Sequence, residues 1–340
     1  MQDATNTSSM RSRGISLLLV LLLTTLLMAQ ERVRFVTYNV ENLFDCVDDS
    51  LTQDEEFLPT ALRRWTPNRY WNKLHAVART LATIGADRAP DIVALCEVEN
   101  DSVLRDLTRR SALRSVGYEY LMTTSLDPRG IDVALLYKPT TFRPFTHQSL
   151  RLPARQIPEG RTVRDVLCVS GCLVTGDTLD ILVCHLPSRL NGRQSARLRH
   201  SVSAFMRHAM DSISALRTVP RIVVMGDFND VPSSRALRPL HVDGGLVCVT
   251  EDLGGSYRYK GKWEQIDHIY LSPALVDSTQ KLHVVAPRAW VVNESFLVEP
   301  EPLYGGYRPL RTYNGMKYTG GTSDHLPLCI DLQFSWSDYQ

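Results

Sequence analysis

Short apolar runs that stop abruptly at polar residues recur along the chain, and residues 223–230 give the clearest case. β-Branched apolar residues lead to Gly226, and Asp227, Asn229 and Asp230 follow within four positions. This pattern is typical of a buried strand that projects polar groups from its carboxyl edge. In layered α/β folds that edge binds ligands. A strand followed by an Asx turn gives the same local pattern, so this segment alone leaves both interpretations open.

The same patterning predicts the other elements. Thr66 and Pro67 supply an N-cap and a first-turn proline, and apolar residues then recur at helical spacing to Ile84. Two further helices are expected, over residues 102–115 and 195–216. Further strands are expected over residues 33–38, 92–97, 118–123, 131–137, 142–152, 163–174, 179–184, 265–271 and 326–334. Residues 286–322 are rich in Pro, Gly and Tyr and are expected to form a long surface loop, which is often functional.

Polar and ionisable residues stand where six of these strands begin or end. The set is Asn39, Glu41, Glu97, His185, Asp227, Asn229, Asp267, Asp324 and His325. A charge that closes a buried strand, as Glu97 does, is costly unless it is paired or binds a metal. Any one of these residues could belong to a turn, but their repetition at strand ends within one domain indicates a common site.

The residue types at these strand ends suit one kind of chemistry. Carboxylates and amides without a Cys/His cluster favour a hard divalent cation, Mg²⁺ first, with Mn²⁺ or Ca²⁺ as alternatives, over zinc. Two histidines beside carboxylates suit general acid–base catalysis or stabilisation of a developing charge. Together they indicate metal-assisted attack of water on a phosphorus centre.

Composition places the chain among ordinary globular proteins. Of its 340 residues, 44% are apolar and 22% charged, which allows a buried core. The formal net charge is +1, without a polybasic arm or acidic tail. This balance allows a nucleic-acid substrate but argues against tight non-specific binding driven by counterion release. No repeat or linker divides residues 30–340, so we expect one domain, with sheets face to face and helices outside, and a monomer without a stable protein partner.

Residues 1–29 have the pattern of a secretory signal peptide. Arg11 and Arg13 precede the apolar run 15–28, and the small residue Ala29 follows it. The run is shorter than the roughly 20 residues of a spanning helix, although an uncleaved N-terminal anchor is an alternative. We therefore expect a secreted or periplasmic protein with no membrane span once the signal is removed. Met10 could be the true start, because a complete signal follows it.

The cysteines predict no disulfide framework. There are seven, an odd number, and no CxxC pair occurs. Cys96, Cys184 and Cys329 lie in apolar runs, where a free cysteine behaves as a small buried apolar residue. One bridge, for example Cys168–Cys172 across a tight hairpin, stays open for an exported protein.

Six segments, in their order and spacing, resemble the endonuclease/exonuclease/phosphatase superfamily, and in particular an exported, bacterial-type, deoxyribonuclease-like member. They are residues 38–42, 92–97, 185–189, 226–229, 266–268 and 323–325, and the resemblance extends from Phe35 to about Phe334. It implies an α/β fold, a four-layer α/β sandwich in which two mixed β-sheets pack face to face with helices outside. It also implies a site at the strand ends.

The resemblance assigns the metal site. Glu97 corresponds to the main metal ligand, with Asn39 and Glu41 beside it. Asp324 would complete the metal site or orient a histidine. His185 stands where deoxyribonuclease-like members have histidine and abasic-site enzymes have tyrosine.

It also assigns the reacting groups. His325 would contact the scissile phosphate and be oriented by Asp267. Asp227 would position or deprotonate the attacking water, and Asn229 would hold a phosphate oxygen. His268 is expected to pack beside its strand end, because alternation turns it away from Asp267.

Substrate contacts are less sharply predicted. We expect Arg129, Ser188 and Arg189 to contact the phosphate or the rest of the substrate, although the two arginines could equally form surface salt bridges. The first hypothesis is an exported nuclease that cuts DNA, with RNA left open as a further substrate. A phosphomonoesterase or a sphingomyelinase-like phospholipase C with the same site is the alternative, and a binding module on a decayed enzyme fold is a third.

Overall fold

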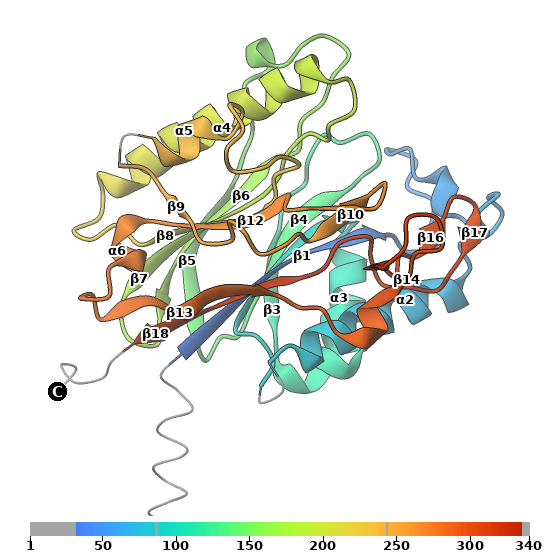
Figure 1. The fold of residues 1–340 in the computed structure, drawn as a ribbon, viewed down its shortest axis with the longest axis horizontal. Helices are drawn as coiled ribbons and strands as arrows, with labels where there is room; N and C mark the ends of the chain where they lie inside the picture. The colour runs from blue at the N-terminus through green and yellow to red at the C-terminus, as the bar shows by residue number, and fades with distance from the viewer. Residues whose placement is uncertain (1–31, 86–87, 243, 335–340) are drawn as a thin grey trace, which may run out of the picture.

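The computed structural model describes residues 32–85, 88–242 and 244–334. The predicted signal peptide, residues 1–29, lies outside the described residues and stays a prediction. Two six-stranded sheets form the centre of the molecule, and helices lie outside each of them (Figure 1). The predicted α/β sandwich of two mixed sheets is confirmed.

The first sheet carries the N-terminal and C-terminal strands. In order across the sheet they are β13 (Leu282–Val291), β18 (Leu328–Phe334), β1 (Arg32–Leu43), β2 (Ile92–Val98), β4 (Asp132–Tyr137) and β3 (Glu119–Met122). β1 and β2 are parallel and the other neighbours are antiparallel. Because parallel strands end at the same edge, Asn39 pairs in register with Cys96, one residue before Glu97.

The second sheet brings three more of the predicted residues into one row. Its strands, in order, are β5 (Phe142–Leu150), β6 (Val166–Leu173), β7 (Thr178–His185), β8 (Ile222–Asp227), β12 (Asp267–Leu271) and β9 (Val247–Cys248). β7 and β8 are parallel, with His185 opposite Asp227. β12 is antiparallel to β8, with Asp267 opposite Asp227 on its other side.

Helices cover the outer faces of both sheets (Figure 1). The first sheet is covered by α2 (Pro67–Thr83), α3 (Asp101–Arg109) and the 3₁₀-helix η2 (Ala112–Val116). The second is covered by α4 (Arg193–Ser214) and α5 (Arg238–His241). Shorter elements are η1 (Glu55–Phe57), η3 (Ala154–Gln156) and α6 (Pro273–Val276). None of the helices described is long and apolar enough to cross a membrane.

The single helix expected over residues 102–115 is two elements. α3 ends at Arg109, and the Ser111 hydroxyl accepts a hydrogen bond of 3.1 Å from the Leu113 amide. Serine therefore caps a new turn instead of continuing the old one.

Three apolar layers hold the sandwich together. Alternation along β8 sends Val224 toward α4 and Met225 into the layer between the sheets. Phe35 of β1 faces Met225 in that central layer, and Leu74 of α2 lies in the outer layer beyond the first sheet. Because both sheets are covered on both faces, their strand ends project from a rigid support.

The loop expected over residues 286–322 is partly structured. It contains the end of β13, η4 (Ser295–Leu297) and the strand pairs β14 (Val298–Pro300) with β15 (Tyr307–Pro309) and β16 (Tyr313–Asn314) with β17 (Lys317–Tyr318). A further hairpin, β10 (Tyr257–Tyr259) with β11 (Lys262–Glu264), precedes β12. Strands of two or three residues are too short to show a two-residue period, so the sequence pattern could not reveal them.

All seven cysteines are free. The bridge left open between Cys168 and Cys172 is not formed, because both residues lie in β6 and not across a hairpin. Four positions along a strand separate α-carbons by about 13 Å, well beyond disulfide reach.

Candidate active site

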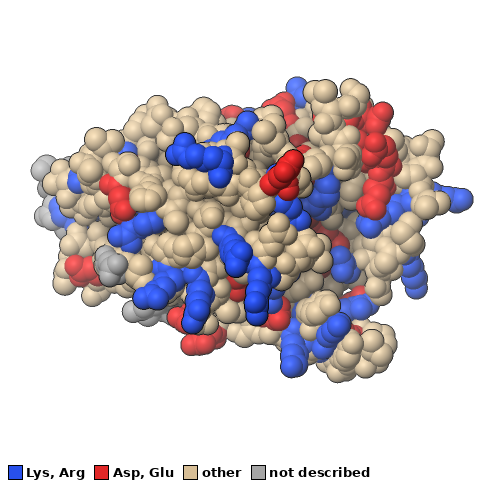
Figure 2. Space-filling model, turned by 90° about the horizontal axis from the view of Figure 1, so that it is seen from above, with Lys and Arg blue, Asp and Glu red and all other residues tan. Residues whose placement is uncertain are grey.

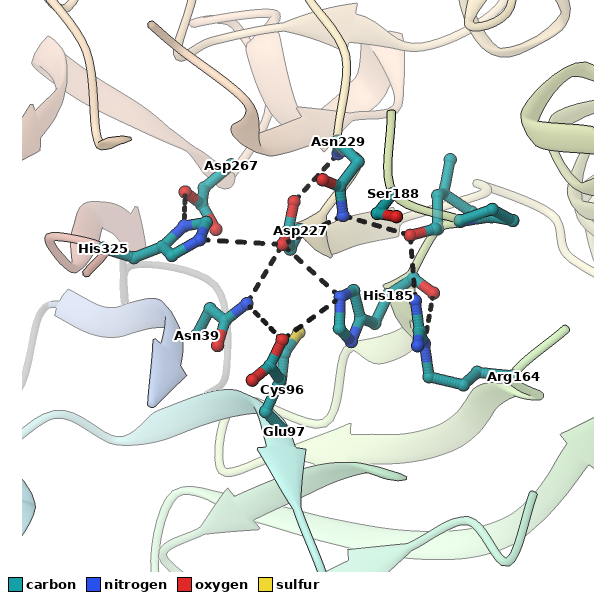
Figure 3. Close-up of polar contacts among 12 residues, drawn as sticks. Asn39, Cys96, Glu97, Arg164, His185, Ser188, Asp227, Asn229, Asp267 and His325 are labelled. Atoms are coloured by element: carbon teal, nitrogen blue, oxygen red, sulfur yellow. Dashed lines mark hydrogen bonds and ion pairs between the residues drawn. The ribbon is translucent and has the colours of Figure 1, made fainter. Parts of the chain in front are cut away.

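The strand ends of the two sheets meet around one cavity of about 840 Å³. Asn39 and Glu97 come from the first sheet, and His185, Asp227 and Asp267 come from the second (Figure 3). Seven of the nine residues predicted at strand ends line the cavity: Glu41, Glu97, His185, Asp227, Asn229, Asp324 and His325. Asn39 and Asp267 lie behind this lining: Asn39 is hydrogen-bonded to Asp227, and Asp267 is hydrogen-bonded to His325.

Asp227 is the centre of the polar network (Figure 3). Its Oδ2 accepts hydrogen bonds from the side-chain amides of Asn39 at 3.0 Å and Asn229 at 3.2 Å. Its Oδ1 accepts the Asn229 backbone amide at 2.8 Å. Burial first, and then the Asp267 carboxylate, raise the pKa of Asp227 to about 7. A carboxylate with this pKa can exchange a proton near neutral pH.

His325 and Asp267 form a buried pair beside Asp227. His325 Nδ1 donates to Asp267 Oδ2 at 2.7 Å, and the same oxygen accepts the Ser256 hydroxyl at 2.6 Å. Burial alone would lower the pKa of His325, but Asp267 and Asp227 raise it well above its usual range. His325 is therefore an imidazolium, and the ring of Tyr257 packs against it at 4.9 Å between centroids.

His185 has the opposite charge state. Burial, followed by the nearby Arg164 and Arg129 guanidinium groups, lowers its pKa well below the usual range. Its Nε2 lies 3.5 Å from Asp227 Oδ2 and 3.7 Å from Glu97 Oε1, so the proton of the neutral ring belongs on that side. The site thus holds one neutral and one charged histidine, both aimed at Asp227.

The backbone is strained where these side chains leave their strands. Glu97, Asn229, Glu41 and Asn42 have positive φ angles of 67°, 51°, 50° and 52°. Such conformations cost a non-glycine residue roughly 1 kcal/mol or more and persist mainly where function requires them. At Glu97 the β2–β4 register shifts between Cys96 and Val98, so a bulge re-aims the glutamate.

The sequence profile described as the Endonuclease/Exonuclease/phosphatase family matches residues 34–334. The chain belongs to this family. The predicted membership is therefore confirmed, and it covers nearly all of the residues described. No curated protein matches the chain.

Solved structures share the fold at low sequence identity. A family protein from Bacteroides thetaiotaomicron is 18% identical, with a TM-score of 0.58 over 89% of this chain and 98% of the other. A mannosyl-6-phosphatase from the same organism is 17% identical, with a TM-score of 0.57 over 89% and 100%. D. rerio TDP2 complexed with single-strand DNA product is 16% identical, with a TM-score of 0.54 over 89% and 100%.

Glu97 fits the role of metal ligand in this endonuclease/exonuclease/phosphatase domain. It borders the cavity, and its Oε2 accepts only the Asn42 amide at 2.9 Å. No Lys or Arg of the described residues forms an ion pair with Glu97, and the histidine 3.7 Å from it, His185, is neutral. A carboxylate that borders a cavity and has no cationic side chain beside it suits a hard divalent ion. Glu97 is therefore a residue that could hold a divalent cation.

Asn39, predicted to lie beside the metal, turns its side-chain amide nitrogen toward two carboxylates. Its Nδ2 faces Asp227 at 3.0 Å and Glu97 at 3.4 Å, while its Oδ1 accepts the Glu41 amide at 3.0 Å. In this structure Asn39 therefore orients the two carboxylates.

A group of three residues beside Glu97 also offers possible metal ligands. Ligand atoms of Asp227, Asp267 and His325 lie within 4.8 Å of one another. Only His325 and Asp267 are hydrogen-bonded to each other, at 2.7 Å, whereas His325 Nε2 lies 3.9 Å from Asp227 Oδ2. The positive charge of His325 opposes a cation there.

Glu41 and Asp324, the other predicted metal ligands, share a guanidinium that the sequence prediction missed. Arg311 Nη2 lies 2.8 Å from Glu41 Oε1 and 3.0 Å from Asp324 Oδ2. Lys73 of α2 approaches the same group from behind and is fully buried, although no feature of its sequence context distinguishes it from a surface lysine.

The three predicted substrate residues line the cavity, but their partners differ. Arg189 bonds Glu264 at 2.7 Å and the Asn229 carbonyl at 3.0 Å, whereas Arg129 is 47% exposed and reaches Asn42 only at 3.4 Å. Ser188 is exposed at the rim. Both arginines therefore have the ion pair foreseen as the alternative, Arg189 with Glu264 at 2.7 Å and Arg129 with Asp127 at 3.7 Å. The longer contacts of Arg129 leave it the better placed for a ligand.

Two further arginines, missed by the sequence prediction, lie on the cavity. Arg164 bonds Asp127 at 2.8 Å and the carbonyls of His185 and Leu186 at 3.1 Å, which fixes the end of β7. Arg161 also lines the cavity. Both precede β6. Arg164 lies within the strand expected over residues 163–174 and Arg161 lies just before it, so nothing marked them as ligands.

His268 packs as predicted. It is fully buried, and its Nε2 donates to the Asp230 carbonyl at 2.9 Å while Thr250 contacts its Nδ1 at 3.2 Å. It braces the loop that follows β8 and does not face the cavity.

Proposed function

We propose that the protein is a divalent-metal-dependent phosphodiesterase that hydrolyses nucleic acid. The observation that carries this proposal is the pairing at Asp227 of a carboxylate whose pKa is near neutrality with one neutral and one charged histidine. Groups whose environments push their protonation states apart mark acid–base pairs in active sites. The arrangement suits attack of water on a phosphate.

Each residue of the network has a distinct task. Asp227 accepts a proton from the attacking water, and Asn39 and Asn229 hold its carboxylate in position. The His325 imidazolium binds an oxygen of the phosphate, with Asp267 maintaining its charge. The Nε2 of the neutral His185 faces Asp227 as well, 3.5 Å from its Oδ2.

A divalent cation held by Glu97, when bound, would offset the negative charge of the phosphate and polarise its oxygen. Mg²⁺ is the first candidate because the donor is a carboxylate, and Mn²⁺ or Ca²⁺ could take its place.

The cavity walls support a substrate with more than one phosphate. Arg129 and Arg164 lie close enough to His185 to lower its pKa, and Arg161 lines the same space. Tyr257 and the half-exposed Tyr259 line the cavity as well and offer aromatic faces to a base. D. rerio TDP2, which shares the fold, has been solved with single-strand DNA product. Phosphates flanking the scissile one can bind these arginines.

Surface charge limits how the nucleic acid is held. On the face seen in Figure 2 the basic side chains gather in its lower half, with acidic ones between and beside them. The formal net charge of the chain is +1. We therefore expect the cavity arginines to contribute most of the binding, with a modest salt dependence.

A phosphomonoesterase is the second candidate. The cavity arginines would also suit the dianionic group of a monoester, and a mannosyl-6-phosphatase shares the fold. A phospholipase C-type activity, also considered from the sequence, has no specific support from the cavity.

The test compares three substrates in Mg²⁺: bis-(p-nitrophenyl) phosphate, p-nitrophenyl phosphate and a single-stranded oligonucleotide. We expect hydrolysis of the diester and the oligonucleotide. Arg161→Gln should raise KM for the oligonucleotide and leave the small diester unaffected, because only the longer substrate reaches Arg161. Hydrolysis of the monoester with the oligonucleotide intact would move the assignment to the second candidate.

We further propose export, which rests on the signal-like pattern of residues 1–29. N-terminal sequencing of protein recovered outside the cytoplasm should begin near Gln30. Recovery of the intact N-terminus only in the cytoplasmic fraction would contradict export.

A further inference from the structure

We propose that Arg311 takes the place of a second metal ion, so that the site binds a single divalent cation, at Glu97. The inference rests on the proposed function, because it concerns the metal of that site. It follows from the way Arg311 engages two of the carboxylates expected to bind metal.

Arg311 uses up the ligand capacity of Glu41. Its Nε and Nη2 both donate to Glu41 Oε1, at 3.0 Å and 2.8 Å. The other oxygen, Oε2, accepts the Thr312 backbone amide at 2.8 Å. Glu41 lines the cavity but is only 6% exposed, so its oxygens cannot move to a metal without breaking these bonds. Charge-assisted hydrogen bonds between arginine and a carboxylate are among the stronger polar contacts in proteins.

Asp324 is held by the same guanidinium. Arg311 Nη2 lies 3.0 Å from Asp324 Oδ2, and this one nitrogen therefore bridges the two acids. A divalent ion placed there would have to displace Arg311 or bear its repulsion.

A second cation supports the group from the protein interior. Lys73 Nζ donates to Thr312 Oγ1 at 2.5 Å and to the Thr322 carbonyl at 3.1 Å. These bonds tie α2 to the segments on either side of β16 and β17, which carry Arg311 and Asp324. The segment that carries Arg311 and Asp324 is thus held to α2 by contacts that need no metal.

Glu97 is the exception among these carboxylates. All three line the cavity, but no Lys or Arg of the described residues forms an ion pair with Glu97. Arg311 does not line the cavity. Arg311 is therefore a positioning residue that neutralises Glu41 and Asp324 and directs the metal to Glu97.

Mn²⁺ titration of the full chain tests this, with bound metal counted by electron paramagnetic resonance and affinity taken from calorimetry. We expect one Mn²⁺ per wild-type chain. In Arg311→Gln, Glu41 and Asp324 lose their shared cation, and the count should rise to two. Arg308→Gln is the matched control, since Arg308 pairs with Glu299 at 2.8 Å in the same loop and should leave the count at one.

Two further variants keep the test decisive if Arg311→Gln does not fold. Glu41→Gln should leave one Mn²⁺ bound with an affinity loss below about tenfold, the lower range for a group outside the metal's own ligands. Glu97→Gln should abolish the binding. Two ions on the wild type, an unchanged count in a folded Arg311→Gln, or loss of metal in Glu41→Gln would overturn the role of Arg311 alone. No ion on the wild type would overturn the metal dependence as well.

Discussion

Asp227 has an environment that no other described carboxylate of the protein shares. Two side-chain amides and a backbone amide hold its oxygens, and a neutral and a charged histidine face it. The amides keep it aligned, while burial and Asp267 keep its pKa near neutrality. This combination makes Asp227 the proton acceptor in our account.

Replacing Asp227 with Asn should leave the fold intact, because an amide fits the same space, and should lower kcat by roughly 10²–10⁴-fold, the usual contribution of a general base. Steady-state kinetics with circular dichroism measures both. Asp211→Asn is the control, since Asp211 lies on the exposed face of α4 and pairs only with Arg207. Equal activity of the two variants would remove Asp227 from the mechanism.

The protonation states required of Asp227 and His325 predict a bell-shaped dependence of activity on pH. Activity should rise as pH increases through about 7, because Asp227 must lose its proton to act as base. It should fall at high pH when the His325 imidazolium deprotonates, and Asp267 holds that pKa up. In Asp267→Asn the alkaline limb should therefore move to lower pH. An alkaline limb that stays in place would show that Asp267 does not set the charge of His325.

Sequence reasoning located the polar residues at strand ends because a run that stops at a charge is visible in one dimension. It could not locate Arg311, which lies in a segment without periodicity and reaches Glu41 across 270 positions of sequence. Nor could it locate Lys73, since a lysine on an amphipathic helix gives no sign of burial. The pairing of Glu41 and Asp324 with one guanidinium arises only in the tertiary structure, so the sequence could not reveal it.

At the scale of elements, the parallel pair β7 and β8 and the antiparallel neighbour β12 determine where the histidine and the acids meet. The register places His185 and Asp267 on either side of Asp227. Gly226 permits this approach. Its φ is +147°, and a β-carbon there would lie 1.9 Å from the Cys184 carbonyl oxygen.

Gly226→Ala should thus force β7 and β8 apart next to Asp227. We expect a loss of roughly 3 kcal/mol or more in the free energy of unfolding, from backbone strain plus overpacking. Urea unfolding measures it. Gly176→Ala is the matched control, because its φ is +85° and nothing lies within 4 Å of the added carbon. That control should lose about 1 kcal/mol, the strain alone. Equal losses would mean that the close approach at Gly226 is unimportant.

Element prediction succeeded where periodicity spans several residues. β2, β8 and β18 were foreseen from apolar runs, and α4 from its apolar stripe. The hairpins of residues 298–318 were not, because each strand is two or three residues long and is held by pairing with a partner. Tyr313 of β16 packs on Trp65 at 6.0 Å, a contact between segments far apart in the chain.

At the scale of the whole molecule, the buried His268 makes folding sensitive to acid. Burial lowers its pKa from 6.5 to about 4, so the unfolded chain binds a proton more readily than the folded one. The stability this gives is present above pH 6.5 and is lost as pH falls toward 4. The loss across this window is roughly 3 kcal/mol.

Urea unfolding of the wild type and His268→Gln at several pH values tests this sensitivity. Glutamine can still donate to the Asp230 carbonyl but does not titrate, so the variant should lose less stability than the wild type on acidification. Parallel pH dependence of the two proteins would show that His268 does not contribute.

The class of fold was predictable from Phe35 to about Phe334 because six short segments keep the order and spacing of one family. Their sum, and not any one segment, carried the assignment, since each resembles an ordinary turn. The substrate was not predictable in the same way. Arg161 and Arg164 reach the cavity through the packing of the segment before β6, which no local pattern reveals.

The central claim is that a metal at Glu97 and a base at Asp227 hydrolyse a phosphodiester. The most direct test offers supercoiled plasmid to the purified protein in Mg²⁺, with and without EDTA, beside Glu97→Gln and Asp227→Asn. We predict nicking by the wild type that EDTA stops and excess Mg²⁺ restores, and no nicking by either variant. Nicking that persists in EDTA, or in a folded Glu97→Gln protein, would contradict the account.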